Sequence, residues 1–141
     1  MAGGPGCNKS EKGCHAFKIQ IAELDSLNCE VNQKQTLIQI RIKGNSPGGA
    51  LYNSKIEIYH IKGAQKNTYC ELQWKDKTDP WKSGSIERDE NLHSKTSYLF
   101  EAWVKKSGSV SIGLPFQLTV SLDHGIPGHM IHKIDLDVKT G

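Results

Sequence analysis

The chain has 141 residues, of which 36% are hydrophobic and 23% charged, and its formal net charge is +3. This length suits one domain with a sizeable core, whereas the scattered lysines and arginines lack the concentrated basic surface of nucleic-acid-binding proteins. No apolar run approaches the roughly 18 residues of a membrane span, so no membrane insertion is expected. The amino-terminal residues lack the apolar centre of a signal peptide, and the sequence fits a cytosolic or a secreted chain equally well.

Residues 1–15, rich in glycine and lysine, are predicted to be a flexible lead-in. They contain Cys7 and Cys14, which would close a small disulfide loop in an oxidising compartment. Cys29 and Cys70 lie near predicted strands, where an unpaired cysteine behaves as a small buried hydrophobe. Four cysteines allow three pairings, and the spacing favours none of them.

Apolar and polar side chains then alternate in short runs. These runs lie at residues 17–24, 36–44, 55–61, 68–74, 98–104 and 115–122. A period of two in segments rich in β-branched and aromatic residues predicts half-buried strands. Turn-forming clusters such as "GNSPGG" and "DKTDPWKSGS" separate the runs, and no segment has a sustained helical period.

This organisation predicts an all-β fold with two antiparallel sheets, a sandwich of about seven strands over residues 16–122. Each sheet would hide one face against the other. About 20 large apolar side chains at roughly 1.5–3 kcal/mol each give a gross burial term of about 30–60 kcal/mol, largely offset by chain entropy. Such a core needs no metal or cofactor, and none is expected.

The segment around residues 92–100 resembles the start of the sixth strand of fibronectin type III domains. There Leu92, Thr96 and Tyr98 match the register of the family's leucine, turn threonine and tyrosine, and Ser94 takes the position of its proline. The resemblance implies that Leu92 plugs the core while the Tyr98 hydroxyl reaches the backbone. It extends over residues 17–122, with specific motifs only in 92–120. The family's tryptophan in the second strand is absent here, so a divergent member and another immunoglobulin-like sandwich both fit.

Two regions hold side chains suited to chemistry. His124, His129 and His132, with Asp123 or Asp135, would suit zinc or copper if they converged, but the glycines and proline between them favour a polar connector. Cys7, Cys14 and His15 form a partial cluster in the lead-in. No metal site is therefore predicted.

Catalytic motifs are missing from the sequence. It contains no phosphate-binding glycine loop and no nucleophile elbow. Asp76 and Asp79, like Glu87, Asp89 and Glu90, are interpreted as carboxylates in solvated loops. The sequence therefore favours a protein that is not an enzyme.

Residues 123–141 are predicted to be a carboxyl-terminal extension with an additional strand. In "HKIDLDVKTG", Ile134, Leu136 and Val138 alternate with Asp135 and Asp137. Pairing with the domain's own edge is favoured. The alternatives are the start of a following domain and addition to the sheet of another protein.

Aromatic side chains provide the candidate partner-binding residues: Trp103, Tyr59, Trp81 and Trp74. Trp103 has the opposite parity to Phe100 and Val104 and should face outward, as should Tyr59. Tyr59 would extend a Trp103 patch if their strands, taken as the third and sixth of the fibronectin type III arrangement, were neighbours. Exposed aromatic residues are enriched at interaction hot spots, although lysine stems could equally cover them. The sequence therefore predicts a non-catalytic protein–protein interaction module of adaptor, receptor or scaffold type, using a sheet face and edge strands. The alternative is a carbohydrate-binding module in which tryptophans stack on sugar rings.

Overall fold

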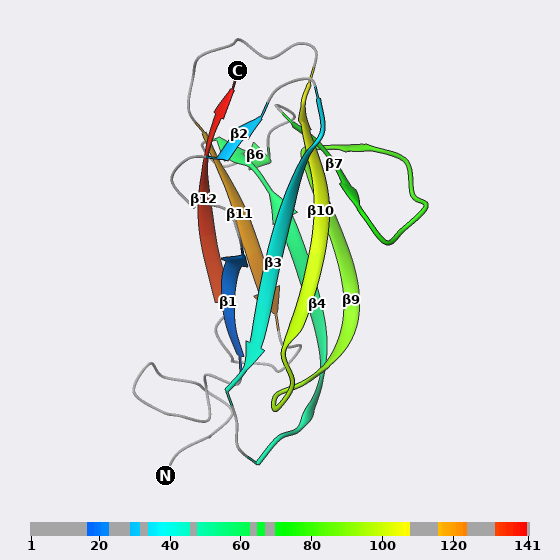
Figure 1. The fold of residues 1–141 in the computed structure, drawn as a ribbon, viewed down its shortest axis with the longest axis vertical. Helices are drawn as coiled ribbons and strands as arrows, with labels where there is room; N and C mark the ends of the chain where they lie inside the picture. The colour runs from blue at the N-terminus through cyan, green and yellow to red at the C-terminus, as the bar shows by residue number, and fades with distance from the viewer. Residues whose placement is uncertain are drawn as a thin grey trace.

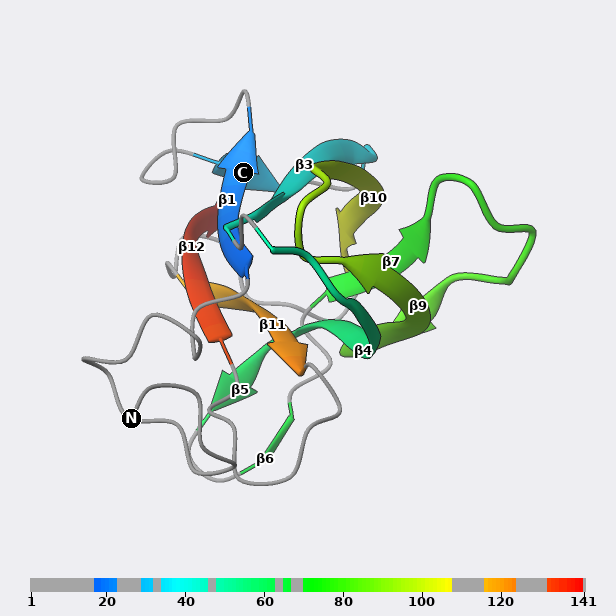
Figure 2. The same cartoon turned by 90° about the horizontal axis from the view of Figure 1, so that it is seen from below.

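The computed structural model describes residues 17–22, 29–31, 34–45, 48–62, 65–66, 70–107, 116–123 and 132–140. All the regular secondary structure in these residues is β-strand. Two sheets stack face to face as the layers of a sandwich, which are visible in the two views of Figures 1 and 2. The predicted all-β, two-sheet antiparallel fold is confirmed.

Sheet A forms one layer, and all its neighbouring strands are antiparallel. In spatial order it consists of β1 (Phe17–Ala22), β3 (Thr36–Gly44), β10 (Tyr98–Lys106), β7 (Cys70–Trp74) and β8 (Lys82–Ser83). The strand β10 lies at its centre, between β3 and β7.

Sheet B forms the other layer. In spatial order it consists of β2 (Cys29–Val31), β12 (His132–Thr140), β11 (Phe116–Asp123), β4 (Leu51–Tyr59) and β9 (Ser85–His93). Its pairs are antiparallel except for β2 and β12, which run parallel. A separate two-stranded pair, β5 (Ile61–Lys62) and β6 (Gln65–Lys66), follows β4.

The core lies between the sheets and follows the predicted alternation. Register places Phe100 of β10 opposite Ile40 of β3, and Val120 of β11 opposite Ile58 of β4. All four side chains are buried, in one hydrophobic cluster that draws on both sheets. Because only alternate residues enter this cluster, the intervening side chains must face outward, and this parity defines the two outer faces of the molecule.

The corner before β10 has the predicted geometry. Leu92 is fully buried, and the peptide N–H of His93 donates a 2.8 Å hydrogen bond to the hydroxyl of Tyr98. Ser94, in the position where the fibronectin type III pattern has proline, donates its own N–H to the carbonyl of Ala50 at 2.8 Å. The Ser94 hydroxyl accepts the Ala50 N–H at the same distance. Proline has no N–H, so this serine contributes a bond that proline could not make.

Among the strands longer than three residues, one was not predicted. Glu87, Asp89 and Glu90 were interpreted as part of a solvated loop, and this is wrong: they belong to β9, the edge strand of sheet B. The apolar pattern is interrupted there because Arg88 occupies the inward position between Ile86 and Leu92. A charged residue that points into the sandwich hides the period of two on which strand prediction depends.

The arrangement does not meet the condition set for a joint patch of Tyr59 and Trp103, that their two strands be neighbours as in the fibronectin type III arrangement. These strands are β4 and β10, and they lie in different sheets: β4 pairs with β11 and β9, while β10 pairs with β3 and β7. The carboxyl-terminal segment forms β12 and pairs with β11 of the same chain.

Candidate functional site

The outward side chains of β10 form the central row of sheet A's outer face. Leu99, Glu101, Trp103 and Lys105 alternate with inward residues such as Phe100, and each of the four is at least partly exposed. Trp103 stands between Leu37 of β3 and Gln73 of β7, its partners in register. The predicted outward orientation of Trp103 is therefore confirmed.

Polar contacts hold the neighbours of Trp103 in place. The ammonium of Lys75 lies 5.9 Å from the centre of the Trp103 ring and 3.6 Å from a carboxylate oxygen of Glu101. The side-chain amide of Gln39 donates a 2.9 Å hydrogen bond to the other carboxylate oxygen of Glu101. A tryptophan on which a lysine rests remains available to a partner, because that lysine is itself half-exposed.

Trp81 lies at the β8 end of sheet A. Its ring is partly buried, with the ammonium of Lys105 4.3 Å from the ring centre. The preceding segment, residues 75–80, is exposed, and its backbone is tied to β7 where the side-chain amide of Gln73 donates to the carbonyl of Asp79 at 2.8 Å. Trp81 and Trp103 therefore each lie under a lysine, one of the alternatives weighed for them.

The other two predicted aromatic residues do not join this face. Trp74 is only 3% exposed, and its indole N–H donates to the carbonyl of Glu87 across the sandwich at 3.2 Å. Tyr59 has the outward parity expected of it but is only 5% exposed, and it lies on sheet B. The condition for a patch of Tyr59 beside Trp103 is therefore not met, because the two residues stand on opposite layers.

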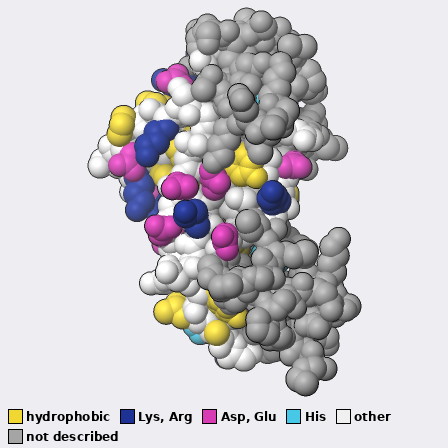
Figure 3. Space-filling view, turned by 180° about the vertical axis from the view of Figure 1, so that it is seen from behind, with side chains coloured by type: hydrophobic (Ala, Val, Ile, Leu, Met, Phe, Trp, Pro, Cys, Tyr) yellow, Lys and Arg dark blue, Asp and Glu magenta, His cyan; other side chains and the backbone are white. Residues whose placement is uncertain are grey.

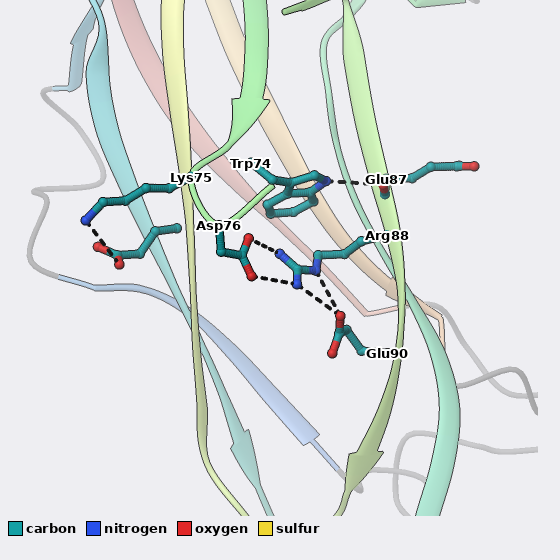
Figure 4. A network of polar contacts seen from close by, with 7 residues as sticks. Trp74, Lys75, Asp76, Glu87, Arg88 and Glu90 are labelled. Atoms are coloured by element: carbon teal, nitrogen blue, oxygen red, sulfur yellow. Dashed lines mark hydrogen bonds and ion pairs between the residues drawn. The ribbon is translucent and has the colours of Figure 1, made fainter. Parts of the chain in front are cut away.

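A buried arginine, Arg88, lies between the two sheets where β7 and β9 approach each other (Figure 4). The Arg88 guanidinium donates two hydrogen bonds to the Asp76 carboxylate, at 2.7 and 2.9 Å, and two to Glu90, at 3.0 and 3.1 Å. Its central carbon lies 5.0 Å from the Trp74 ring centre and 4.9 Å from that of Phe100. With 7% of its side chain exposed, Arg88 completes the core with a charge that both carboxylates neutralise.

These contacts change the acidity of the network. The hydrogen bonds from Arg88 hold the pKa of Asp76 below its usual value, against the opposing effect of partial burial. Burial alone would lower the pKa of Arg88, but the hydrogen bonds with Asp76 and Glu90 outweigh it and raise that pKa. Both shifts favour the charged forms of Asp76 and Arg88.

A shallow hollow of about 320 Å³ opens beside this network. It is lined by Lys75, Asp76, Leu99, Phe100 and Glu101. Leu99 is 44% exposed and supplies the outward apolar side chain of this lining. The hollow therefore combines an apolar contact point with carboxylates.

The outer face of sheet B has a different character. Its outward side chains include Lys55, Glu87, Asp89, Lys133 and Asp135. Acidic and basic groups are interspersed over its described part, seen from behind in Figure 3. Such a mixed, charged surface is typical of a face that stays in water.

Sequence reasoning missed three residues of this region: Arg88, Leu99 and Glu101. Leu99 and Glu101 share the outward parity of Trp103, so the alternation that placed Trp103 on the outer face could have placed Leu99 and Glu101 there as well. For Arg88 the signal was its position two residues after Ile86 and four before Leu92, at the even spacing of inward strand residues.

Several predicted residues lie outside the described part of the structure. They include Cys7, Cys14, His124 and His129. Among the described residues no group of three histidine, cysteine or acidic side chains converges as a metal site would require. The described residues also include no helix with the length and apolarity to cross a membrane.

Comparison with known proteins shows likeness in fold alone. No family model matches the chain, and no curated protein is similar to it in sequence. A solved structure titled "AvmM Catalyzes Macrocyclization in Alchivemycin A Biosynthesis" superposes with a TM-score of 0.54 at 8% identity, covering 96% of this chain and 97% of that one. BslA, described as a bacterial hydrophobin, matches with a TM-score of 0.38 at 8% identity, covering 89% and 94%.

The first of these structures corrects the expectation that the chain is not an enzyme. That expectation rested on missing sequence motifs, yet a protein of similar fold is described as a catalyst of macrocyclization. Catalytic groups are recognised by their geometry in space, and sequence motifs do not transfer between unrelated families. A sandwich of this kind is therefore compatible with catalysis.

Proposed function

We propose that this protein is a protein–protein interaction module whose contact surface is the outer face of sheet A together with its edge strands β1 and β8. The observation that carries the proposal is the row on β10, where Trp103 and the 44% exposed Leu99 stand on one outward face. On the outer face of sheet B, Leu51 of β4 is 65% exposed, but Tyr59 at the other end of that strand is only 5% exposed, so no exposed aromatic side chain accompanies the leucine among the described residues.

Trp103 is the residue expected to contribute most to the free energy of binding a partner. A tryptophan offers a large rigid surface, and such residues often dominate binding when a partner excludes water around them. Lys75 and Gln39 form a polar rim around it, joined through Glu101. A partner would displace the lysine, which is half-exposed and returns to water at little cost.

The relationship of this sandwich to a known fold family is a second part of the proposal. The corner formed by Leu92 and Tyr98 supports a fibronectin type III-like or other immunoglobulin-like domain. The pairing of β10 with β3 counts against the first of these, because the tyrosine-bearing strand was expected beside β4. We therefore favour a more distant immunoglobulin-like relationship, which suits adaptor, receptor and scaffold roles.

The direct test compares partners captured by the wild-type chain and by Trp103→Ala. We expect the captured partner to bind the variant about thirtyfold more weakly, as at a hot spot of about 2 kcal/mol. Lys133→Ala on sheet B, an exposed residue on the other layer, is the matched control and should bind as the wild type does. Identical affinities for wild type and Trp103→Ala, measured by titration calorimetry with the purified partner, would contradict the proposal.

Carbohydrate binding is the second candidate, favoured by the position of Trp81 and Trp103 on the same sheet, each only partly buried. A sugar ring would have to displace Lys105 from Trp81, since that ammonium lies 4.3 Å from the ring centre. Tryptophan fluorescence titrated with a glycan panel separates the two functions. A saturable change that is lost in both Trp81→Ala and Trp103→Ala would establish the sugar function instead.

A further inference from the structure

Four partly exposed side chains form a row that crosses the strands on the outer face of sheet A. Register pairs Leu37 of β3 with Trp103 of β10, and Trp103 with Gln73 of β7. The pairing of β7 with β8, continued by one residue, places Trp81 opposite Gln73. Lys105, an outward residue of β10, lies 4.3 Å from the centre of the Trp81 ring, so that ring is on the same face. Leu37, Trp103, Gln73 and Trp81 are called the transverse row below.

The sheet fixes the interval between the two tryptophans of the transverse row. Their strand positions are two strand spacings apart, roughly 9.6 Å, with Gln73 between them. The side chain of Gln73 is itself held in place by its 2.8 Å hydrogen bond to the carbonyl of Asp79. The transverse row therefore offers two large apolar surfaces at a set distance.

Both tryptophans also have a hydrogen-bond donor to offer. The indole N–H of Trp74 donates to the carbonyl of Glu87, but among the described residues none accepts a hydrogen bond from Trp81 or Trp103. Neither of these two indole nitrogens is buried without a partner, so both can be reached from solvent. An indole N–H can donate but cannot accept, and a ligand must therefore bring acceptors.

Charges around the transverse row are balanced, and none of its four members is charged. The outward residues of β7 and β10 together with residues 75–82 include four lysines and four carboxylates, a net charge of zero. Arg88 and Glu90, which extend the contacts of Asp76 inward, add one charge of each sign. On the outward face of β3 the nearest charge is Arg41, four residues from Leu37 or about 13 Å away. The eight balanced residues are Lys75, Lys77, Lys82, Lys105, Glu71, Asp76, Asp79 and Glu101.

These features match one class of polypeptide. A surface without excess charge of either sign suits an uncharged ligand. Proline has a carbonyl acceptor and no N–H donor, which complements a row whose free polar groups are donors. In the polyproline II conformation three residues advance about 9.3 Å, close to the interval between Trp103 and Trp81.

We propose that the transverse row binds an uncharged, proline-rich segment of a partner protein in the polyproline II conformation, running across the strands. Prolines three residues apart would pack on Trp103 and Trp81, and an adjoining residue would contact Leu37. The ammonium groups of Lys75 and Lys105, which now lie over the two rings, would turn to carbonyls of the segment. This inference rests on the proposed function, since it names the class of partner that the Trp103 surface takes.

The experiment uses the full chain and two fluorescein-labelled peptides of nine prolines. One contains only L-proline, and its twin alternates L- and D-proline, which keeps the composition but prevents the polyproline II helix. We expect the all-L peptide to bind at least about tenfold more tightly by fluorescence polarisation. Its affinity should change less than about twofold between low and high salt, because no net charge is neutralised. Equal binding of the two peptides, or a steep loss of affinity with salt, overturns the proposal.

Variants locate the bound peptide. Trp81→Ala and Trp103→Ala should each weaken binding of the all-L peptide at least about fivefold, because each removes one of the two contact surfaces. Leu51→Ala, at an exposed leucine on the other layer, is the matched control and should bind as the wild type does. Circular dichroism checks that the variants are folded, and Trp103→Phe, with a smaller ring and no N–H, should bind with intermediate affinity. Wild-type affinity in either tryptophan-to-alanine variant overturns the proposal.

The remaining outcomes separate this inference from the proposed function. If the all-L peptide does not bind while Trp103→Ala still loses the captured partner, only the proline-rich partner is ruled out. If the captured partner binds Trp103→Ala as tightly as the wild type, the proposed function fails and this inference fails with it. A glycan that binds saturably and is lost in both tryptophan variants, with no binding of the all-L peptide, assigns the transverse row to sugar and overturns the inference.

Discussion

At the scale of single residues, close contacts between backbone segments decide which positions tolerate change. Gly44 ends β3 directly against the corner that carries Tyr98: a Cβ atom there would lie 2.4 Å from the carbonyl oxygen of Ser94 and 2.7 Å from the nitrogen of Thr96. Both neighbours are backbone atoms of residues whose N–H groups donate hydrogen bonds, Ser94 to Ala50 and Thr96 to His93, so they cannot move aside as a flexible side chain would.

Gly44→Ala should therefore lower the free energy of unfolding by about 1–3 kcal/mol, the usual cost of overpacking. Urea denaturation followed by tryptophan fluorescence measures this as a lower midpoint with an unchanged slope. Gly48→Ala is the matched control, because nothing lies within 4 Å of its added Cβ. Equal midpoints for the two variants would show that the corner is more pliable than the structure indicates.

The ion pair of Asp76 and Arg88 makes stability depend on pH. The pKa of Asp76 is lower in the folded chain, so the stability it contributes is fully present above its unfolded pKa of about 3.9. That contribution is lost as the pH falls through the lower folded pKa. Asp76→Asn should be less stable than the wild type at pH 7, and the difference should shrink progressively below about pH 4. Thermal unfolding of both proteins between neutral and acidic pH tests this, and a constant difference would contradict it.

At the scale of secondary structure elements, β9 shows how an edge strand is protected. Arg88 points inward from this strand, where an apolar residue would otherwise complete the core between Ile86 and Leu92. Inward charges on edge strands oppose edge-to-edge pairing with other chains, since such pairing would strip the charge of its partners.

Arg88→Leu should accordingly lower solubility as well as stability. The leucine keeps an apolar contact with the Trp74 and Phe100 rings, but it leaves Asp76 and Glu90 without their cation, so we expect the free energy of unfolding to fall by about 1–3 kcal/mol. Light scattering during prolonged incubation should also show more association than in the wild type. If the variant stays monomeric for as long as the wild type, the edge is protected by other features.

The elements also show how far the sequence could predict the fold. Strands with strict alternation, such as β3 and β10, were located to within a few residues, because one face of each enters the core. The strand β9 was not predicted because its inward positions include the charged residues Arg88 and Glu90. The hollow beside Leu99 could not be predicted, because it exists only where β7 leaves β10, and that is a matter of how two distant segments pair.

At the scale of the whole molecule, the last strand belongs to the sandwich. Leu136 of β12 is fully buried in the common core, and β12 pairs with β11 along seven register positions, from Phe116 opposite Val138 to Leu122 opposite His132. The boundary predicted after residue 122 therefore separates strands that share one core. Alternation within a strand shows that one of its faces is buried, but it does not show which strands are neighbours. The short alternating runs therefore indicated two layers without giving the order of their strands.

A chain that ends at Asp123 should fail to unfold cooperatively. Removal of β12 exposes the edge of β11 and takes away the burial of Leu136, worth about 1.5–3 kcal/mol by itself against a typical total of about 5–15 kcal/mol. Circular dichroism on heating checks this, with Leu136→Ala in the full chain as the milder comparison. A sharp transition in the shortened chain would show that residues 17–123 fold alone.

The parallel pairing of β2 with β12 has a consequence for how the protein is made. The residues Cys29–Val31 have their sheet partner at residues 138–140, more than a hundred positions later. On the ribosome, sheet A can assemble once β10 has emerged, while sheet B stays incomplete until residues 132–140 follow. In that interval the apolar inner surface of sheet A would be exposed and would offer a transient binding site for chaperones.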